Sequence, residues 1–255
     1  MEKSIIFRQA SNLHELKALL KLRYQGYLHS QCASLIEHNR YQIDLDSYDL
    51  RALHFGIFET DGLRAKPIGY VRLIQDELAP SAPLLWQLAF THPELLPKLE
   101  KDPETPFPFM QYHPDADWLS YYIAEAKAKG QKLVEASRFV FDPNVRSKGL
   151  AGFVTEATLS IVFFSLAYKK LMLVCNPSHC RFYSRAGFQY LDEGIQSDYQ
   201  DLPARFMVNE AHTIPAHLKK RMISLACQFD QHGAVRKQDA IIKKTVAKRE
   251  IIKAA

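Results

Sequence analysis

The stretch Phe141-Asp-Pro-Asn-Val-Arg-Ser-Lys-Gly-Leu-Ala151 joins a β-rich run, Lys132 to Asp142, to a long apolar run, Gly149 to Tyr168. The first turn of a helix has backbone N–H groups without acceptors, so a strand followed by a helix aims them at an anion. Gly149 permits close backbone approach, and the neighbouring basic side chains add positive charge. The sequence therefore predicts a diphosphate-binding turn, with an ordinary basic helix start as the alternative; its residues are Arg146, Ser147, Lys148, Gly149, Leu150 and Ala151.

A second strand-to-helix turn follows this segment. Lys170 to Cys175 has the pattern of a short buried strand, Ser178 to Ala186 that of a capped helix, and Phe188 to Leu191 that of another strand. A strand, a helix and a strand in succession form a crossover between parallel strands. We therefore predict an α/β fold with a parallel pair at its centre.

The N-terminal half has clear helix and hairpin signals. Ser11 and Asn12 can cap a helix that extends to about residue 30. Asp61-Gly62 separates two β-rich runs, Leu53 to Glu59 and Pro67 to Ile74, which is typical of a hairpin. These runs predict antiparallel strands beside the parallel pair.

Residues 76–114 contain eight prolines, at 80, 83, 93, 97, 103, 106, 108 and 114, so we expect an irregular insertion with a short helix near Pro93 to Glu100. Downstream we predict a helix over Asp115 to Gly130, a closing strand over Ala204 to Asn209, and helices over Pro215 to Phe229 and Asp239 to Lys253. The division expected is a main domain over 1–210 and a basic helical extension over 211–255.

The composition suits a folded α/β domain: 255 residues, 47% hydrophobic and 24% charged, which excludes disorder and collagen. No apolar run reaches the roughly 18 residues of a membrane span, and the N-terminus lacks a secretory signal. Four cysteines are too few for a disulfide framework, so we expect small core residues in a reducing, cytoplasmic setting. The net charge of +5 is concentrated in Arg236 to Lys253.

Residues 132–191 resemble the GNAT acyltransferases. Their pattern Gln/Arg-x-x-Gly-x-Gly/Ala is matched by Arg146, Gly149 and Ala151, and the later Asn, Tyr and Gly-Phe by Asn176, Tyr183 and Gly187-Phe188. The resemblance implies a mixed, mostly antiparallel central sheet flanked by helices. It also implies that the pantetheine arm of an acyl thioester lies between two splayed parallel strands, Leu133 to Phe141 and Leu171 to Cys175.

The same resemblance implies roles in acyl transfer. Backbone N–H groups near Phe139, Val140 and Phe141 would polarise the thioester carbonyl, and Tyr183 would protonate the leaving thiolate. Asn176 would contact the pantetheine arm. For Tyr183 the alternative is an aromatic residue packed in the core.

Further motifs resemble the acyl-homoserine-lactone (autoinducer) synthases and the related N-acyl amino acid synthases. They are Arg-x-x-x-aromatic, Asp-x-x-Asp, Gly-x-x-Arg-Leu and Glu-x-Ser-Arg-Phe, matched by Arg23, Tyr27, Asp46, Asp49, Arg72, Glu135 and Arg138. Leu28 to Arg40 lacks the Trp common in the lactone synthases. This departure, with the clean phosphate motif, favours the N-acyl amino acid synthases.

This resemblance implies transfer of a long-chain acyl group from an acyl carrier protein or CoA thioester to the amine of an amino acid. Glu135 would act as base, and Arg72 or Arg138 would pair with the acceptor carboxylate. Arg23, Tyr27, Asp46 and Asp49 would complete the acceptor site, with the aspartates orienting the arginines. Structural ion pairs are the alternative for any of these charged residues.

An acyl chain needs an apolar tunnel, which the insertion aromatics would line unless they pack in the core; they are Trp86, Phe90, Phe107, Phe109 and Tyr112. An acidic carrier protein would dock on the basic tail and on Arg146, Lys148, Lys169 and Lys170.

Two other functions fit parts of the sequence. One is an acetyl-CoA-dependent small-molecule N-acetyltransferase. The other is a non-catalytic acyl-thioester-binding or regulatory protein that contacts nucleic acid through Arg236 to Lys253. Cys175, His179 and Cys180 lack a second ligand pair, so we expect no metal.

Overall fold

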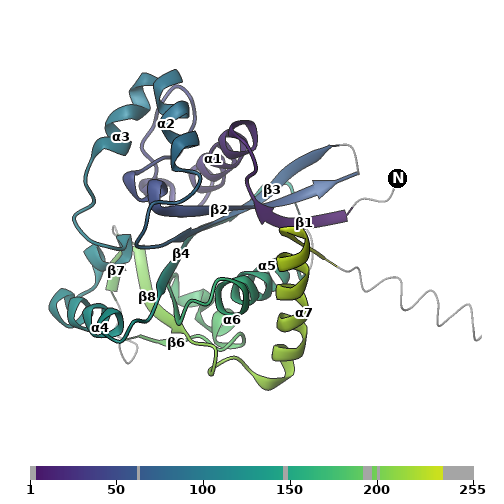
Figure 1. Ribbon diagram of the computed structural model, residues 1–255. Coiled ribbons are helices and arrows are strands. Elements are labelled where there is room, and N and C mark those ends of the chain that lie inside the picture. Colours follow the sequence, from purple (N-terminus) through teal and green to yellow (C-terminus); the bar gives the residue numbers. More distant parts are fainter. Residues whose placement is uncertain (1–3, 62–63, 146–148, 192–196, 200–201, 238–255) are drawn as a thin grey trace, which may run out of the picture.

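The computed structural model describes residues 4–61, 64–145, 149–191, 197–199 and 202–237. One mixed sheet crosses the molecule in the order β6-β8-β5-β4-β3-β2-β1-β9, and β7 pairs with β8 (Figure 1). Only β4 and β5 are parallel among the pairs of described strands. The predicted mixed, mostly antiparallel sheet is confirmed; its strands are β1 (Ser4–Gln9), β2 (Ala52–Thr60), β3 (Ala65–Ile74), β4 (Leu133–Phe141), β5 (Lys170–Cys175), β6 (Gln189–Tyr190), β7 (Ser197–Tyr199), β8 (Leu202–Asn209) and β9 (Ala234–Arg236).

Helices flank both faces of this sheet (Figure 1). They are α1 (Leu13–Leu28), α2 (Ala82–Thr91), α3 (Leu96–Glu100), α4 (Ala116–Ala128), α5 (Leu150–Ser160), α6 (Cys180–Ser184) and α7 (Ala216–His232). A π-helical segment, Ile161–Ser165, continues α5. Short 3-10 helices cover Ala33–Leu35, Ser47–Arg51, Pro93–Leu95, Pro108–Tyr112 and Pro177–His179.

Local signals explain most of these boundaries. The Asn12 side chain accepts from the Glu15 N–H at 3.0 Å and begins α1, and Asp115 accepts from the Trp118 N–H at 2.8 Å and begins α4. Gly130, with φ of 68°, follows the end of α4. The predicted hairpin is present as β2 and β3, and the predicted crossover as β4, α5 and β5.

The insertion is more regular than its prolines suggested. The short helix expected near Pro93 to Glu100 is present as Pro93–Leu95 and α3, but α2 was missed. Pro83 lies in the first turn of α2, where a backbone N–H needs no intrahelical acceptor. Prolines at helix starts therefore do not prevent helix formation here.

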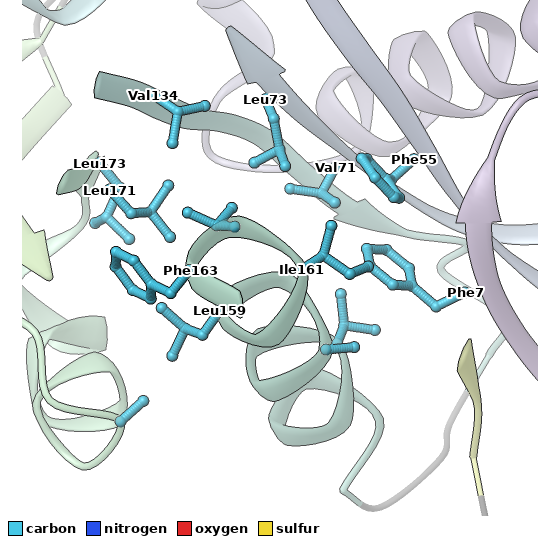
Figure 2. Packing of buried hydrophobic residues seen from close by; sticks show 14 of the residues in the cluster. Phe7, Phe55, Val71, Leu73, Val134, Leu159, Ile161, Phe163, Leu171 and Leu173 are labelled. Carbon is cyan, nitrogen blue, oxygen red and sulfur yellow. The ribbon is translucent and has the colours of Figure 1, made fainter. Parts of the chain in front are cut away.

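The two faces of the sheet carry different cores. Figure 2 shows the larger one, in which α5 packs on side chains from β1 to β5 such as Phe55, Leu73 and Leu171. On the opposite face, α4 packs over β4, β5 and β8 in a second cluster that includes Phe107 and Phe109. The alternation of side chains along β3 and β4 sends their polar residues toward this opposite face.

The C-terminal segment is part of this framework. Met222 and Leu225 of α7 lie in the larger core, and β9 adds antiparallel to β1. The helix expected over Pro215 to Phe229 is confirmed, whereas the one expected over Asp239 to Lys253 lies outside the described residues. In the described part of the chain, every helix is too short or too polar to cross a membrane.

All four cysteines are free. Cys175 and Cys180 are buried in the larger core, as expected for small core residues. Cys227 is exposed on α7, so the core assignment was wrong for that residue.

Candidate active site

The parallel strands β4 and β5 separate part-way along their length. Their pairing runs from Leu133 opposite Lys170 to Ala136 opposite Leu173, although β4 extends to Phe141 and β5 to Cys175. The predicted splayed pair is therefore present. Its open end leaves the backbone of β4 facing a gap.

A β-bulge in β4 lies at this opening. Tyr70 pairs with Val140 and Arg72 with Ser137, so Arg138 and Phe139 together lie opposite one residue of β3. Arg138 has a φ of 56°, which is uncommon for a residue with a side chain. A bulge re-aims side chains and leaves backbone groups outside the ladder, so this one can present N–H groups to a ligand.

Two hollows meet at the bulge. The first, about 380 Å³, lies between the splayed strands and α5 and has mostly apolar walls such as Val154, Leu159 and Leu171. The second, about 470 Å³, reaches Glu135 and the start of β8. The residues that line both are Tyr27, Ser30, Cys32, Ala136, Ser137, Arg138, Val174, Cys175, Asn176 and His179. A thioester on one side and an acceptor on the other would meet between β4 and β5.

Behind the hollows lies a buried network of arginines and aspartates. Arg23 of α1 donates to both Asp49 carboxylate oxygens at 2.8 Å, and neither side chain is exposed. Arg72 of β3 donates to Asp46 at 2.7 Å and to Asp49 at 3.0 Å. Because paired guanidinium groups stabilise its charge, the pKa of Asp49 lies well below its usual range despite burial.

Arg138 connects this network to the hollows. Its Nε donates to Asp44 Oδ2 at 3.1 Å, and the same oxygen lies 2.7 Å from Arg23 Nε. Its guanidinium group lies over the Tyr27 ring, 5.2 Å from the centroid. Of the three arginines in the network, Arg138 lines both hollows, and Asp44 and Tyr27 hold it in place.

His54 and Tyr70 complete the buried network. The His54 Nε2 lies 3.2 Å from the Asp49 carbonyl oxygen, so it carries the proton, and Nδ1 accepts from the Tyr70 hydroxyl at 2.8 Å. Tyr70 in turn accepts from Arg23. Burial lowers the pKa of His54 to about 4, which keeps it neutral at pH 7.

Glu135 lies on the wall of the second hollow and is almost fully buried. Burial raises the pKa of this carboxyl group to about 8, although Arg72 and the Phe109 N–H, 3.3 Å away, oppose the shift. A carboxylate with such a pKa is basic enough to take a proton from an ammonium group.

Tyr183 of α6 lines the first hollow and packs edge-on against Phe188. Burial raises the pKa of Tyr183 well above its usual range, so it stays protonated. Tyr183 thus packs against the larger core and also lines the first hollow, and its role as proton donor remains a prediction.

The structure separates the predicted site residues into groups. Tyr27, Glu135, Arg138, Phe139, Val140, Phe141, Asn176 and Tyr183 line one or both hollows. Arg23, Asp49 and Arg72 are buried and line neither hollow, so an orienting role for them fits the structure and acceptor contact remains a prediction. Asp46, partly exposed, pairs with Arg72.

The phosphate turn is described only in part. Gly149 precedes α5 with a φ of 78°, and Leu150 and Ala151 form the first turn of that helix. Arg146, Ser147 and Lys148 lie outside the described residues. Backbone N–H groups at the start of α5 remain the element suited to a phosphate.

The structure also bears on the expected acyl tunnel and the expected docking surface. Phe107 and Phe109 are buried in the α4 core, Phe90 is exposed, and none of the five insertion aromatics lines either hollow. Lys169 and Lys170 follow the C-terminal end of the helical run that begins at Leu150, roughly 24 Å away at 1.5 Å per residue. Lys170 also pairs with Glu210 at 2.7 Å. Lys169 and Lys170 therefore lie near the opposite end of this helical run from Gly149, and docking of a carrier protein remains a prediction.

The sequence analysis missed several site residues. Ser137 accepts from Arg72 Nε at 3.0 Å and lines both hollows, and Asp44 bridges two arginines. Ser137 lies inside the Glu-x-Ser-Arg-Phe motif and Asp44 lies two residues before the Asp-x-x-Asp motif, so a signal was available near both. Gly26 lies inside the Arg-x-x-x-aromatic motif, whereas Cys32 lies in none of the motifs noted and lines both hollows only because of the fold.

Comparisons with known proteins agree with this geometry. Residues 115–210 match the family model described as N-acyl amino acid synthase FeeM. This range contains the splayed strands, α5 and α6 and spans less than half of the chain. The resemblance of this chain to the N-acyl amino acid synthases is thereby confirmed over this range.

A solved acyl-homoserine lactone synthase shares the fold of this chain. The CoA-dependent acyl-homoserine lactone synthase BjaI, solved with MTA, has a TM-score of 0.51 at 14% identity over 86% of this chain and 89% of that one. FeeM, an N-acyl amino acid synthase from uncultured soil microbes, has a TM-score of 0.48 at 16% identity over 82% and 92%. The AHL synthase LasI has 0.47 at 19% over 93% and 98%. The comparison with curated protein sequences found no match to this chain.

Proposed function

We propose that this protein is an acyltransferase of the GNAT superfamily that moves a long-chain acyl group from a carrier-protein or CoA thioester to the amine of an amino acid. The observation that carries the proposal is the meeting of two hollows at the β4 bulge, with Arg138 on the wall of both. The match of residues 115–210 to the N-acyl amino acid synthase family agrees with it.

On the donor side, the pantetheine arm lies between the splayed strands with its phosphates at the start of α5. Apolar side chains beneath α5 suit an acyl chain. Backbone N–H groups of Phe139, Val140 or Phe141 at the bulge hold the thioester oxygen, which becomes negatively charged during attack.

On the acceptor side, Arg138 pairs with the carboxylate of the amino acid. Glu135, as the carboxylate, takes a proton from the ammonium group, and the neutral amine attacks the thioester carbon. The carbon–sulfur bond then breaks, and Tyr183 gives a proton to the thiolate that leaves. Arg23, Arg72, Asp46 and Asp49 hold Arg138 and the strands in place without contacting the acceptor.

An acyl-transfer assay with purified full-length protein tests this proposal. Decanoyl carrier protein, decanoyl-CoA and acetyl-CoA would each be offered with a panel of amino acids, and the product identified by mass spectrometry. We expect a decanoyl amino acid, with Arg138→Met raising KM for the amino acid more than it lowers kcat.

The same assay separates the alternatives. Acetylation without decanoyl transfer would identify a small-molecule acetyltransferase. Thioester binding without thiol release, under every condition, would identify a non-catalytic thioester-binding protein. Faster transfer from decanoyl carrier protein than from decanoyl-CoA would assign the donor.

A further inference from the structure

Three sulfur atoms lie together at the end of β5, and the residue that carries one of them, Cys175, lines both hollows. Cys175 Sγ lies 3.8 Å from Cys180 Sγ and 3.8 Å from Met207 Sδ. Both cysteines are buried, at 9% and 5% exposure, and both are reduced. The proposed acyl-transfer steps use neither thiol.

The two cysteines belong to elements with different roles. Cys175 ends β5 and lines both hollows, whereas Cys180 begins α6, the helix that carries Tyr183. The connection between them is the short 3-10 helix Pro177–His179, which Asn176 caps through the Ser178 N–H. A covalent bond between the two sulfurs would therefore act on the end of β5, on Asn176 and on α6 together.

We propose that Cys175 and Cys180 form a reversible disulfide that narrows or distorts the first hollow, where the donor thioester is proposed to bind. The sulfur atoms need to approach from 3.8 Å to the roughly 2.05 Å of a disulfide bond, so the two side chains must turn toward each other and hold the end of β5 against the start of α6. Cys32, which also lines both hollows, is the competing partner for Cys175.

The oxidant is a hydroperoxide that reaches Cys175 through the two hollows that this residue lines. One thiolate attacks a peroxide oxygen, giving a sulfenic acid and hydroxide or alkoxide, which takes up the proton lost by the thiol. The second thiol attacks the sulfenyl sulfur and releases water, so the two thiols lose two electrons and the peroxide is reduced. Burial raises the pKa of the Cys175 thiol, which makes the first step slow unless Cys180 performs it.

The disulfide itself does not depend on the proposed acyl transfer, but protection by substrate does. If the pantetheine arm lies between the splayed strands, bound CoA covers Cys175 and slows its oxidation. The effect of oxidation on CoA affinity likewise rests on that site.

Peroxide treatment of the full-length protein, followed by peptide mass spectrometry without reduction, tests the pair. We expect a Cys175–Cys180 linked peptide that has lost the mass of two hydrogen atoms, and its disappearance in Cys180→Ser. We expect CoA binding, measured by calorimetry, to weaken roughly 10-fold to 100-fold, because misplacing a binding group by about 1 Å costs on this order. A thiol reductant should restore it.

Cys227→Ser is the matched control, since Cys227 is exposed on α7 and far from the pair in sequence. It should respond to peroxide like the unmodified protein. A Cys32–Cys175 linkage, or two unlinked sulfinic acids, would overturn the assigned pair. A Cys175–Cys180 disulfide that leaves CoA affinity unchanged would overturn the proposed effect of this disulfide on the first hollow. Absence of acyl transfer by the reduced protein would count against the proposed function alone.

Discussion

The raised pKa of Glu135 governs how the proposed reaction depends on pH. The acid form is unable to accept a proton from the amine, so kcat/KM should rise as the pH increases through about 8. Glu135→Gln should lower kcat by roughly 10²- to 10⁴-fold, the usual contribution of a general base, while CoA affinity stays the same. Stopped assays across pH 6 to 10 would measure both. A variant with unchanged turnover would remove Glu135 from the reaction.

Glu135→Gln should lower turnover but raise the free energy of unfolding relative to the unmodified protein. The folded protein holds a proton on Glu135 up to about pH 8, whereas the unfolded chain releases it near the ordinary value of 4.5. Glu135 therefore costs stability as the pH rises from 4.5 to about 8. Glu135→Gln should become progressively more stable than the unmodified protein over this window, in urea titrations at each pH. Parallel pH curves for the two proteins would contradict the raised pKa.

Asp49 is the residue on which the buried network depends, because it pairs with both Arg23 and Arg72. Asp49→Asn leaves two buried guanidinium groups short of negative charge, and we expect about 3–5 kcal/mol of destabilisation. The matched control is Glu125→Gln, which removes the carboxylate from an exposed pair with Lys129 and should have little effect. Denaturant unfolding of both variants measures the contrast. Equal effects would mean that the network contributes no more than a surface pair.

Sequence motifs identified most of the charged residues of the site, but they did not show which of these side chains are buried and which line a hollow. Asp49 and Arg138 come from motifs of the same kind, yet one is sealed behind the sheet and the other lines both hollows. Which of them faces a ligand depends on the β4 bulge and on how closely α1 approaches β4. At Gly26 a side-chain carbon would lie 3.0 Å from Val140 Cβ, and nothing local in the sequence reveals such a packing distance.

At the scale of elements, the start of α5 tests the phosphate turn. Gly149 has a positive φ and open space around it, so backbone conformation rather than crowding restricts this position. Gly149→Val should strain the turn by about 1–3 kcal/mol and weaken CoA binding roughly tenfold or more, because the first turn of α5 would shift. Gly149→Asn is the control, since Asn tolerates this conformation. Calorimetry with CoA distinguishes them, and equal affinity in the two variants would exclude the turn from binding.

Elements with strong local signals were predictable, and those shaped by neighbours were not. Asn12 and Asp115 begin α1 and α4 through side-chain caps, and the Asp61-Gly62 pair in the sequence was enough to predict the β2–β3 hairpin. The helix α2 was missed because its proline was counted as a breaker. The π-helical end of α5 carries no local signal either, and its residues Ile161 and Phe163 pack in the larger core (Figure 2).

At the scale of the whole molecule, residues 216–236 connect two parts of the fold. Strand β9 pairs with β1 at one edge of the sheet, and α7 packs in the larger core beside α5. Val235 of β9 is fully buried in the larger core. Val235→Ala should destabilise the protein by about 2 kcal/mol, from roughly 0.8 kcal/mol for each of two lost carbon groups plus a cavity. The control Ile223→Ala, on the exposed side of α7, should stay within about 0.5 kcal/mol. Equal stability of the two variants would make residues 216–236 an independent appendage.

The separation of β4 from β5 also couples ligand binding to folding. The sheet gives up cross-strand hydrogen bonds beyond Ala136 and Leu173, and the pantetheine arm carries amide groups that can occupy the positions of a missing strand. A donor that binds only the folded chain adds about 2.7 kcal/mol to its stability at a hundred times Kd. The heat resistance of this protein should therefore follow the cell's supply of acyl thioesters, and a poorly supplied cell would hold a more readily unfolded enzyme.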